Sequence, residues 1–344
     1  MNLNNFDFPI SKNILLTGAG FTHNYGGFLA KRMWSEIHNR YLKLSSELET
    51  RELKTAIKKT FNYEDLYEDV LQSSVYTNDE RSFFLKAILG AYDALDEVIR
   101  EFRPEIMASD ILDLNKLRDF FKKLTGEPKE RGFFFTLNQD LFIERYCFEG
   151  GIGPSLPGLQ INNRRFISKE SRPLNEIGYV KISQDGNVNY QDTNKLQNLS
   201  KLFYVKLHGS YDWRDEQNQE ILILGTNKPS RISSTPLLTW YFDLFKTVLS
   251  IPNARLMIIG YGFQDKHINE IIASAVKNSN LRIFILNPQD PESFLYKTLR
   301  INQWASDAIW KAVDGYYQIT PKEIFSRNSN RTSLANTLLK DYFD

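Results

Sequence analysis

The alternation of apolar and polar stretches along the chain predicts buried strands that are separated by helices. Short apolar runs, each bounded by turn-forming residues, lie at 13–17, 133–136, 203–207, 221–224, 255–259 and 282–286. Continuous apolar runs of this length are typical of strands that are buried on both faces of a parallel sheet. Helices fit between the later runs at 237–250 and 266–277, the second with Asp265 at its N-cap. We therefore predict an α/β fold that is built on a parallel sheet, with 282–286 as its last strand.

A long helical stretch separates the first predicted strand from the second. Its first amphipathic stripe consists of Leu29, Met33, Trp34, Ile37 and Tyr41. A second helix is predicted at 79–102, and Pro104 ends it. A further short helix is predicted at 140–148, and the Gly-, Pro- and Asn-rich segment 150–190 predicts loops with one or two hairpins. We divide the chain into a sheet domain (1–27 and 128–310), a helical insertion module (28–127) and a helical or polar C-terminal tail (311–344).

Composition and charge exclude several function classes. The chain has 42% hydrophobic and 25% charged residues, and its 43 basic and 42 acidic side chains leave a net charge of +1, so no polyanionic partner is indicated. No apolar run reaches 18 residues, and Met1–Asp7 lacks the features of a signal peptide, so we expect a cytoplasmic protein without a membrane partner. We interpret the basic loop Asn162–Arg165 as a solvated surface rather than a nucleic-acid site.

Cysteine usage limits the metal sites that the chain can form. Cys147 is the only cysteine, which excludes an intrachain disulfide and a zinc site of paired cysteines. The four histidines, at 23, 38, 208 and 267, show no ligand-like spacing. We therefore expect no zinc and no other metal.

Three turns that follow predicted strands carry the candidate chemistry. They are Gly18–Thr22, Thr136–Asp140 and His208–Gly209. Open parallel sheets bind ligands at the carboxyl ends of their strands, which is where these turns lie. Glycine lets a backbone approach a pyrophosphate and direct amide groups toward it, so the first turn is a candidate phosphate site.

Taken one by one, these turns also have purely structural interpretations. His23 breaks the full GxGxxG spacing, so the first turn could join a strand to a helix without a ligand. Asp140 could cap the helix that follows it. His208 could be a hydrogen-bonded residue of the core. A conventional nicotinamide dehydrogenase is disfavoured, because no acidic residue ends a strand about twenty positions after the first turn.

Together and in order, the three turns resemble those of sirtuins. Sirtuins carry a Gly-Ala-Gly turn followed by Ser or Thr, then a Thr-Gln-Asn-x-Asp segment, then a catalytic His-Gly. The resemblance continues through Ile259–Phe263, where sirtuins have a nucleotide loop, and Leu286–Pro288, where an asparagine meets the adenosine ribose. It covers roughly residues 10–290 and implies a Rossmann-like, sirtuin-type parallel sheet with a large inserted helical module.

The departures from the sirtuin pattern refine this interpretation. One cysteine cannot build the four-cysteine zinc ribbon of protein-deacylating sirtuins, and Gly26–Arg32 replaces their Gly-Ile-Pro-Asp-Phe-Arg loop. Leu137 stands where they have glutamine. Instead, 18–34, 206–213 and 260–269 are similar to the sirtuin-like NADases of bacterial anti-phage defence.

This resemblance implies an NAD+ hydrolase that releases nicotinamide and ADP-ribose and acts as a toxic effector by depleting NAD+ during abortive infection. The implied catalytic residues are Asn138, His208 and Asp140. The implied binding residues for NAD+, the substrate, are Gly18, Ala19, Gly20, Phe21, Thr22, Gly260, Tyr261 and Asn287. Two alternatives stay open: an NAD-dependent protein deacylase or ADP-ribosyltransferase, and a non-catalytic module that senses NAD or ADP-ribose.

Control of such an activity is expected to come from outside the chain. Family members of this size resemble those that are paired with a hexameric helicase-type ATPase, so we expect such a partner to act in trans on a homo-oligomer. The helical insertion and the C-terminal tail are the candidate contact regions. The sequence identifies neither the trigger, nor the partner, nor the resting oligomer, nor whether the isolated chain is active.

Overall fold

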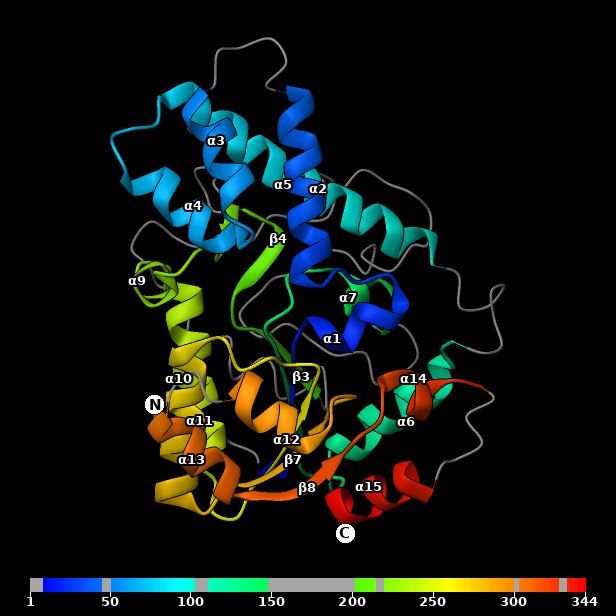
Figure 1. Cartoon of the computed structure of the whole chain (residues 1–344). Helices are drawn as coiled ribbons and strands as arrows, with labels where there is room; N and C mark the ends of the chain where they lie inside the picture. Colours follow the sequence, from blue (N-terminus) through cyan, green and yellow to red (C-terminus); the bar gives the residue numbers. More distant parts are fainter. Residues whose placement is uncertain are drawn as a thin grey trace.

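A six-stranded parallel sheet forms the centre of the protein (Figure 1). The computed structural model describes residues 9–44, 51–102, 111–147, 202–214, 220–299, 303–327 and 333–344. The strand order is β3-β2-β1-β6-β7-β8. The bounds are β1 Ile10–Thr17, β2 Arg131–Thr136, β3 Leu202–Lys206, β6 Arg255–Ile259, β7 Arg282–Leu286 and β8 Val313–Tyr317.

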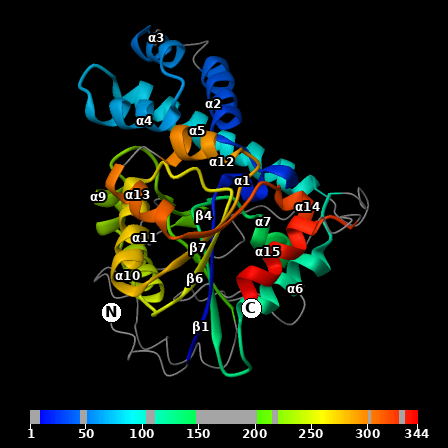
Figure 2. The ribbon, with the colours of Figure 1, turned by 60° about the horizontal axis from the view of Figure 1, so that its bottom comes forward.

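Helices cover both faces of this sheet, as the prediction of an α/β fold requires. Figure 2 shows α10, α11 and α13 on one face and α6, α14 and α15 on the other. The four central strands β1, β2, β6 and β7 are buried almost throughout, which explains their continuous apolar runs. The bounds are α6 Leu114–Leu124, α7 Phe142–Cys147, α9 Lys228–Ser233, α10 Pro236–Leu249, α11 Lys266–Ser279, α12 Pro291–Ser293, α13 Gln303–Lys311, α14 Pro321–Phe325 and α15 Ser333–Phe343. The predicted Rossmann-like parallel sheet is confirmed.

Two strand predictions were wrong. The run at 221–224 does not join the main sheet, because β5 (Glu220–Leu222) pairs antiparallel with β4 (Gly209–Arg214) in a separate hairpin. The run at 282–286 is not the last strand, because β8 pairs parallel with β7 beyond it. β8 contains Asp and Gly and is only partly buried, as an edge strand can be, so it has no apolar run to reveal it.

The predicted helical stretch before β2 forms a group of four helices, α2–α5, and a separate helix, α6. α2 (Ala30–Leu44) packs along α5 (Asn78–Glu101), and α4 (Tyr63–Gln72) contacts both of them and α3 (Arg51–Lys59). We call α2–α5 the helical module; it lies at the top of Figure 1. α6 instead packs against β1, β2 and β3 and belongs to the layer that covers the sheet.

The helical module is fixed to the sheet domain at several buried points. The guanidinium of Arg145 on α7 donates two hydrogen bonds of 2.8 and 2.7 Å to the carboxylate of Asp96 on α5. Asp96 is only 2% exposed. The Tyr146 hydroxyl donates to the carbonyl oxygen of Ile99 at 2.6 Å. A bidentate pair of this kind orients the two helices as well as joining them.

The segment after residue 311 is part of the packed fold. α15 packs near β8, and the buried Tyr342 hydroxyl donates to the carbonyl oxygen of Ile14 in β1 at 2.7 Å. The predicted loops of 150–190, the basic loop Asn162–Arg165, Pro104 and Met1–Asp7 all lie outside the described residues. In the part of the chain that is described, every helix is too short or too polar to cross a membrane.

Candidate active site

The carboxyl ends of five parallel strands lie level with one another. Thr17 of β1 pairs with Thr136 of β2 and Ile259 of β6, Thr136 pairs with Lys206 of β3, and Ile259 pairs with Leu286 of β7. Every turn that was singled out from the sequence therefore lies at one edge of the sheet. The chain runs from β1 outward to β3, and then from β6 outward to β8 on the other side. The switch point, where open sheets place ligands, is between β1 and β6.

The two glycine-containing turns meet at this switch point. The amide of Gly18 donates to the carbonyl oxygen of Ile259 at 3.0 Å. The amide of Gly20 donates to the carbonyl oxygen of Gly260 at 2.9 Å. A Cβ on Gly18 would lie 2.8 Å from the Gly260 carbonyl oxygen, and a Cβ on Gly260, which has φ +66°, would lie 2.2 Å from the Phe21 amide nitrogen. Close backbone packing alone therefore requires these glycines, so they are not specific evidence for a phosphate.

Asn138 and Asp140 are joined through Thr22. The Thr22 hydroxyl donates to Oδ2 of Asp140 at 2.9 Å and accepts from Nδ2 of Asn138 at 3.3 Å. Oδ1 of Asp140 accepts from the amide of Phe142 at the start of α7 at 3.1 Å. Asp140 thus has the structural role that the sequence left open, and it also orients Thr22. With its amide nitrogen engaged, Asn138 offers Oδ1, which accepts no hydrogen bond from the described residues.

His208 follows β3 at the same end of the sheet at which Asn138 follows the adjacent β2. Both residues are two positions beyond the paired residues Thr136 and Lys206, so they extend equally far from adjacent strands. Asn138 is 7% exposed and His208 is 3% exposed. The carbonyl oxygen of His208 accepts from the amide of Ile223 at 3.0 Å, which ties the end of β3 to the β4–β5 hairpin.

A second histidine, which the sequence spacing did not reveal, contacts the first. Nε2 of His267, in the first turn of α11, lies 3.2 Å from Nε2 of His208. Burial, the largest cause, lowers the pKa of His208 to about 3; Asp265 opposes this shift, whereas Lys228 and His267 add to it. Burial likewise lowers the pKa of His267 to about 4. Both rings are therefore neutral at physiological pH, so each keeps one ring nitrogen without a hydrogen.

An ion-pair cluster lies next to the two histidines. The Lys228 ammonium donates to Asp265 at 2.7 Å and lies 2.9 Å from Glu64 of α4. Although burial opposes it, the carboxylates of Asp265 and Glu64 raise the pKa of Lys228, so this ammonium stays charged. Asp265 is at the N-cap position of α11, as predicted, but its side chain binds Lys228 instead of capping the helix.

These side chains could in principle hold a metal ion. His208, Asp265 and His267 each offer one ligand atom, and the three atoms lie within 4.8 Å of one another. However, the Lys228 ammonium already occupies an Asp265 oxygen, and its charge opposes a second cation close by. We therefore interpret the cluster as a neutral histidine pair beside an ion pair. That no zinc is bound stays a prediction.

A buried lysine, Lys206, binds the backbone of the segment that follows β2. Lys206 is fully buried, and its ammonium donates to the carbonyl oxygen of Asp140 at 2.6 Å and to the carboxylate of Glu144 at 2.7 Å. Burial raises the pKa of Glu144 to about 7, and Lys206 opposes this shift. Removing the lysine would leave a buried carboxylate unpaired and would free the Asp140 backbone.

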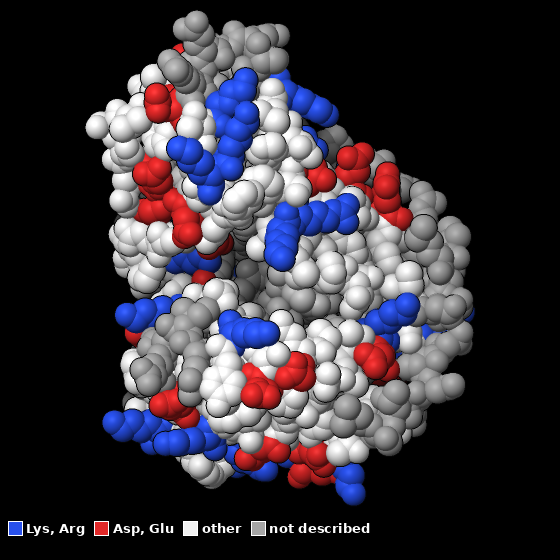
Figure 3. Space-filling view, viewed as in Figure 1, with Lys and Arg blue, Asp and Glu red and all other residues white. Residues whose placement is uncertain are grey.

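Gln139, whose role the sequence did not reveal, connects the candidate site to the helical module. The Tyr92 hydroxyl of α5 donates to Oε1 of Gln139, and Nε2 of Gln139 donates to the carbonyl oxygen of Ile223 at 2.6 Å. Tyr92 also stacks on Tyr211 of β4, with ring centroids 5.9 Å apart. Figure 3 shows a hollow between the helical module and the rest of the protein, with basic and acidic side chains both present on this face.

The remaining predicted binding residues differ in their surroundings. Phe21 is fully buried, and its ring packs edge-on against four other aromatic rings, whereas Ala19 is exposed. The buried Tyr261 hydroxyl donates to Asn269 at 2.9 Å and so braces the turn. Asn287 is half-buried, and its Oδ1 accepts from the amide of Gln289 at 2.9 Å. Whether any of them contacts NAD+ stays a prediction.

A comparison with protein families identifies the fold of this site. The model of the SIR2-like domain matches residues 132–309, which is more than half of the 344-residue chain. The chain belongs to the SIR2-like domain family. The matched segment includes Asn138, His208 and His267, and it ends within α13. A search among curated proteins finds no match.

Membership in this family explains why polar side chains gather at the strand ends. SIR2-like domains bind NAD+ and are generally NAD-dependent enzymes, so NAD-related chemistry is the class of activity that the site belongs to. The resemblance to sirtuins that the three turns predicted is confirmed. The candidate site comprises the turns after β1, β2, β3 and β6, together with the first turn of α11, and the family match includes all of these except the turn after β1.

Proposed function

We propose that this chain is an NAD+ glycohydrolase that converts NAD+ and water to nicotinamide and ADP-ribose. The observation that carries the proposal is the pairing of an oriented amide, Asn138, with a neutral buried imidazole, His208, at the ends of adjacent strands. A module that only binds NAD+ requires neither group. The missing four-cysteine set supports hydrolysis over protein deacylation, because Cys147 is the only cysteine.

The chemistry of NAD+ suits this pair. The nicotinamide leaves as a neutral molecule and takes the electrons of the glycosidic bond, so it needs no general acid, unlike the leaving group of an ordinary glycosidase. Oδ1 of Asn138 provides a fixed dipole for the oxocarbenium-like ribose and can orient a water molecule. Neutral His208 accepts the proton of the attacking water. Thr22 and Asp140 hold the Asn138 amide in place.

The cellular role is the second part of the proposal. We propose that the chain is a cytoplasmic effector of anti-phage defence, which acts by depleting NAD+ in abortive infection. We also propose that it works as a homo-oligomer that a hexameric helicase-type ATPase controls in trans. The resemblance of 18–34, 206–213 and 260–269 to sirtuin-like NADases of anti-phage defence supports this part.

Release of nicotinamide tests the proposed reaction. The purified full chain is incubated with NAD+, and the chain is also expressed in bacteria whose NAD+ content is followed. We expect nicotinamide and ADP-ribose in equal amounts, and a loss of at least about 100-fold in Asn138→Ala and His208→Ala. Asn278→Ala and His38→Ala are matched controls outside the site and should keep full activity. No NAD+ consumption in either setting overturns the proposal, and transfer of ADP-ribose or an acyl group to protein favours the transferase or deacylase.

A further inference from the structure

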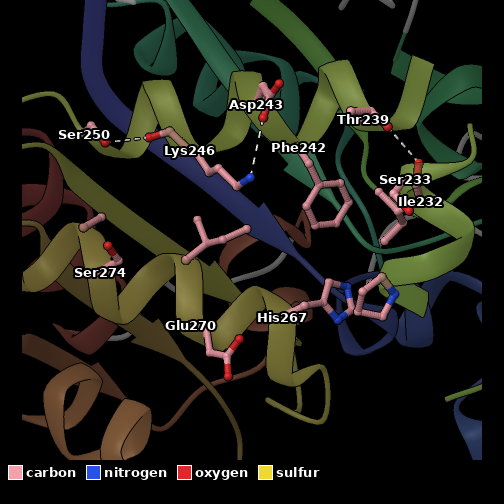
Figure 4. A pocket seen from close by; sticks show the side chains of 13 residues that line it. Ile232, Ser233, Thr239, Phe242, Asp243, Lys246, Ser250, His267, Glu270 and Ser274 are labelled. Carbon is pink, nitrogen blue, oxygen red and sulfur yellow. Dashed lines mark hydrogen bonds and ion pairs between the residues drawn. The ribbon is translucent and has the colours of Figure 1, made fainter. Parts of the chain in front are cut away.

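A pocket behind the histidine pair opens between α10 and α11. Its volume is about 450 Å³. Figure 4 shows that Phe242, Asp243 and Lys246 line it from α10, and that His267, Glu270 and Ser274 line it from α11. The opening is therefore lined by both charged and apolar groups, and it lies on the α10–α11 side of the sheet.

His267 is the residue that joins this pocket to the candidate site. Its ring lines the pocket next to Phe242, with ring centroids 5.5 Å apart, and its Nε2 lies 3.2 Å from Nε2 of His208. His208 is 3% exposed and does not line the pocket. A group that contacts His208 on one side and the pocket on the other is positioned to exchange protons between them.

Hydrolysis of NAD+ creates the need for such an exchange. Water adds its oxygen to the anomeric carbon, the bond to nicotinamide breaks, and nicotinamide leaves with the electron pair of that bond. One proton of the water remains to be removed in each turnover. If His208 accepts it, a buried imidazolium forms beside the Lys228 ammonium, and this charge must be discharged before the next cycle.

We propose that His267 takes this proton from His208 through the Nε2–Nε2 contact and passes it to water in the pocket between α10 and α11. The inference rests on the proposed NAD+ hydrolysis. His267 is thus a positioning residue that acts through His208. In the resting state one Nε2 carries the hydrogen and the other accepts it, so the contact couples the tautomers of the two rings.

The charged groups around the pair fit this role. Asp265 precedes α11 and favours a proton on either ring, whereas Lys228 of α9 disfavours one. Glu64 of α4 binds the same ammonium and so limits its effect. On the pocket side, Glu270 lines the same wall as His267, and its carboxylate lies 3.8 Å from the Lys266 ammonium. The rings are therefore neutral at rest, but a transient proton has a route out.

Chemical rescue tests the relay in the active protein. His267→Ala removes the ring and enlarges the pocket by space that an imidazole molecule can occupy. We expect NAD+ hydrolysis to fall roughly 10- to 100-fold, with KM little changed, and added imidazole to restore much of the rate in a saturable way. Glu270→Ala alters the same pocket wall and should lower the rate less. Asn138→Ala should gain nothing from imidazole. A His267→Ala chain with wild-type rate and pH profile overturns the relay.

A measurement without turnover separates this inference from the proposed function. With ¹⁵N-labelled histidine, the full chain gives ring signals from only four residues, at 23, 38, 208 and 267. We expect His267→Gln to move the Nε2 signal of His208, and His38→Gln to leave it in place. An unmoved His208 signal overturns the contact itself. If the His208 signal moves but the chain never consumes NAD+, the proposed hydrolase is refuted and the contact between the two histidines is supported.

Discussion

The hydroxyl of Thr22 lies 3.3 Å from Nδ2 of Asn138, although 116 residues separate them in the chain. The same hydroxyl donates to Asp140, so its hydrogen is directed away from Asn138 and only its lone pair is left for the amide. This geometry fixes which end of Asn138 can face a substrate. A glycine turn after β1 thus controls the orientation of a side chain after β2.

Replacing Thr22 by valine tests this control. The change keeps the shape and removes the hydroxyl, so Asn138 can rotate its amide and Asp140 loses a donor. We expect kcat for NAD+ hydrolysis to fall at least about tenfold, and the free energy of unfolding to fall by about 1–3 kcal/mol. Thr22→Ser restores the hydroxyl and should recover most of the activity. Equal activity in the valine and serine variants would contradict the role.

A pair of alanine substitutions after β6 tests the packing of the two turns. Gly260→Ala places a Cβ 2.2 Å from the Phe21 amide nitrogen at a φ of +66°. We expect a loss of more than about 2 kcal/mol in the free energy of unfolding, measured by urea denaturation. Gly262→Ala is the matched control, since its Cβ would meet only Gln264 Cγ at 3.9 Å. Similar losses in both variants would refute the interpretation.

Acid should weaken the fold through the histidine pair. The folded pKa values of His208 and His267 are about 3 and about 4, whereas the ordinary value is 6.5. Below pH 6.5 the unfolded chain binds protons that the folded chain does not, so the contribution of the pair to stability is complete above 6.5 and is lost as pH falls through about 4 and about 3. Urea titrations of the wild type and of His208→Gln/His267→Gln should show a smaller loss in the double variant. Parallel pH curves would exclude the pair as the cause.

The Lys206–Glu144 ion pair can be tested by breaking it from one side and then from both. Lys206→Met leaves the Glu144 carboxylate buried without its cation and should cost about 3–5 kcal/mol in the free energy of unfolding. Adding Glu144→Gln removes the orphaned charge and should recover part of the loss. Chemical denaturation measures both. A single variant as stable as the wild type would show that this buried pair contributes little.

Much of the fold was predictable because burial on both faces leaves a continuous apolar run. The strands β1, β2, β3, β6 and β7 were recognised in this way, as was the position of the turns after them. β8 escaped because an edge strand carries polar residues, and 221–224 was misplaced because an apolar run does not encode its pairing partner.

The candidate site was predictable only where its residues directly follow strands. Asn138 and His208 belong to such turns. His267 does not, because it lies on a helix, 59 residues after His208, and the contact depends on how α11 is placed over the strand ends. The roles of Gln139 and Lys228 were not predicted either, because they depend on contacts between distant parts of the chain. The partners of these two residues, Tyr92 and Glu64, are on the helical module.

The bond from Tyr342 to Ile14 has a consequence for synthesis of the protein. Ile14 is made first, and its hydrogen-bond donor follows 328 residues later. At the usual pace of translation, roughly 15–65 s pass between the two. During this time β1, the strand that precedes the first glycine turn, lacks this hydrogen bond. A chain that has not yet reached Tyr342 therefore holds the strand before the candidate site without this hydrogen bond.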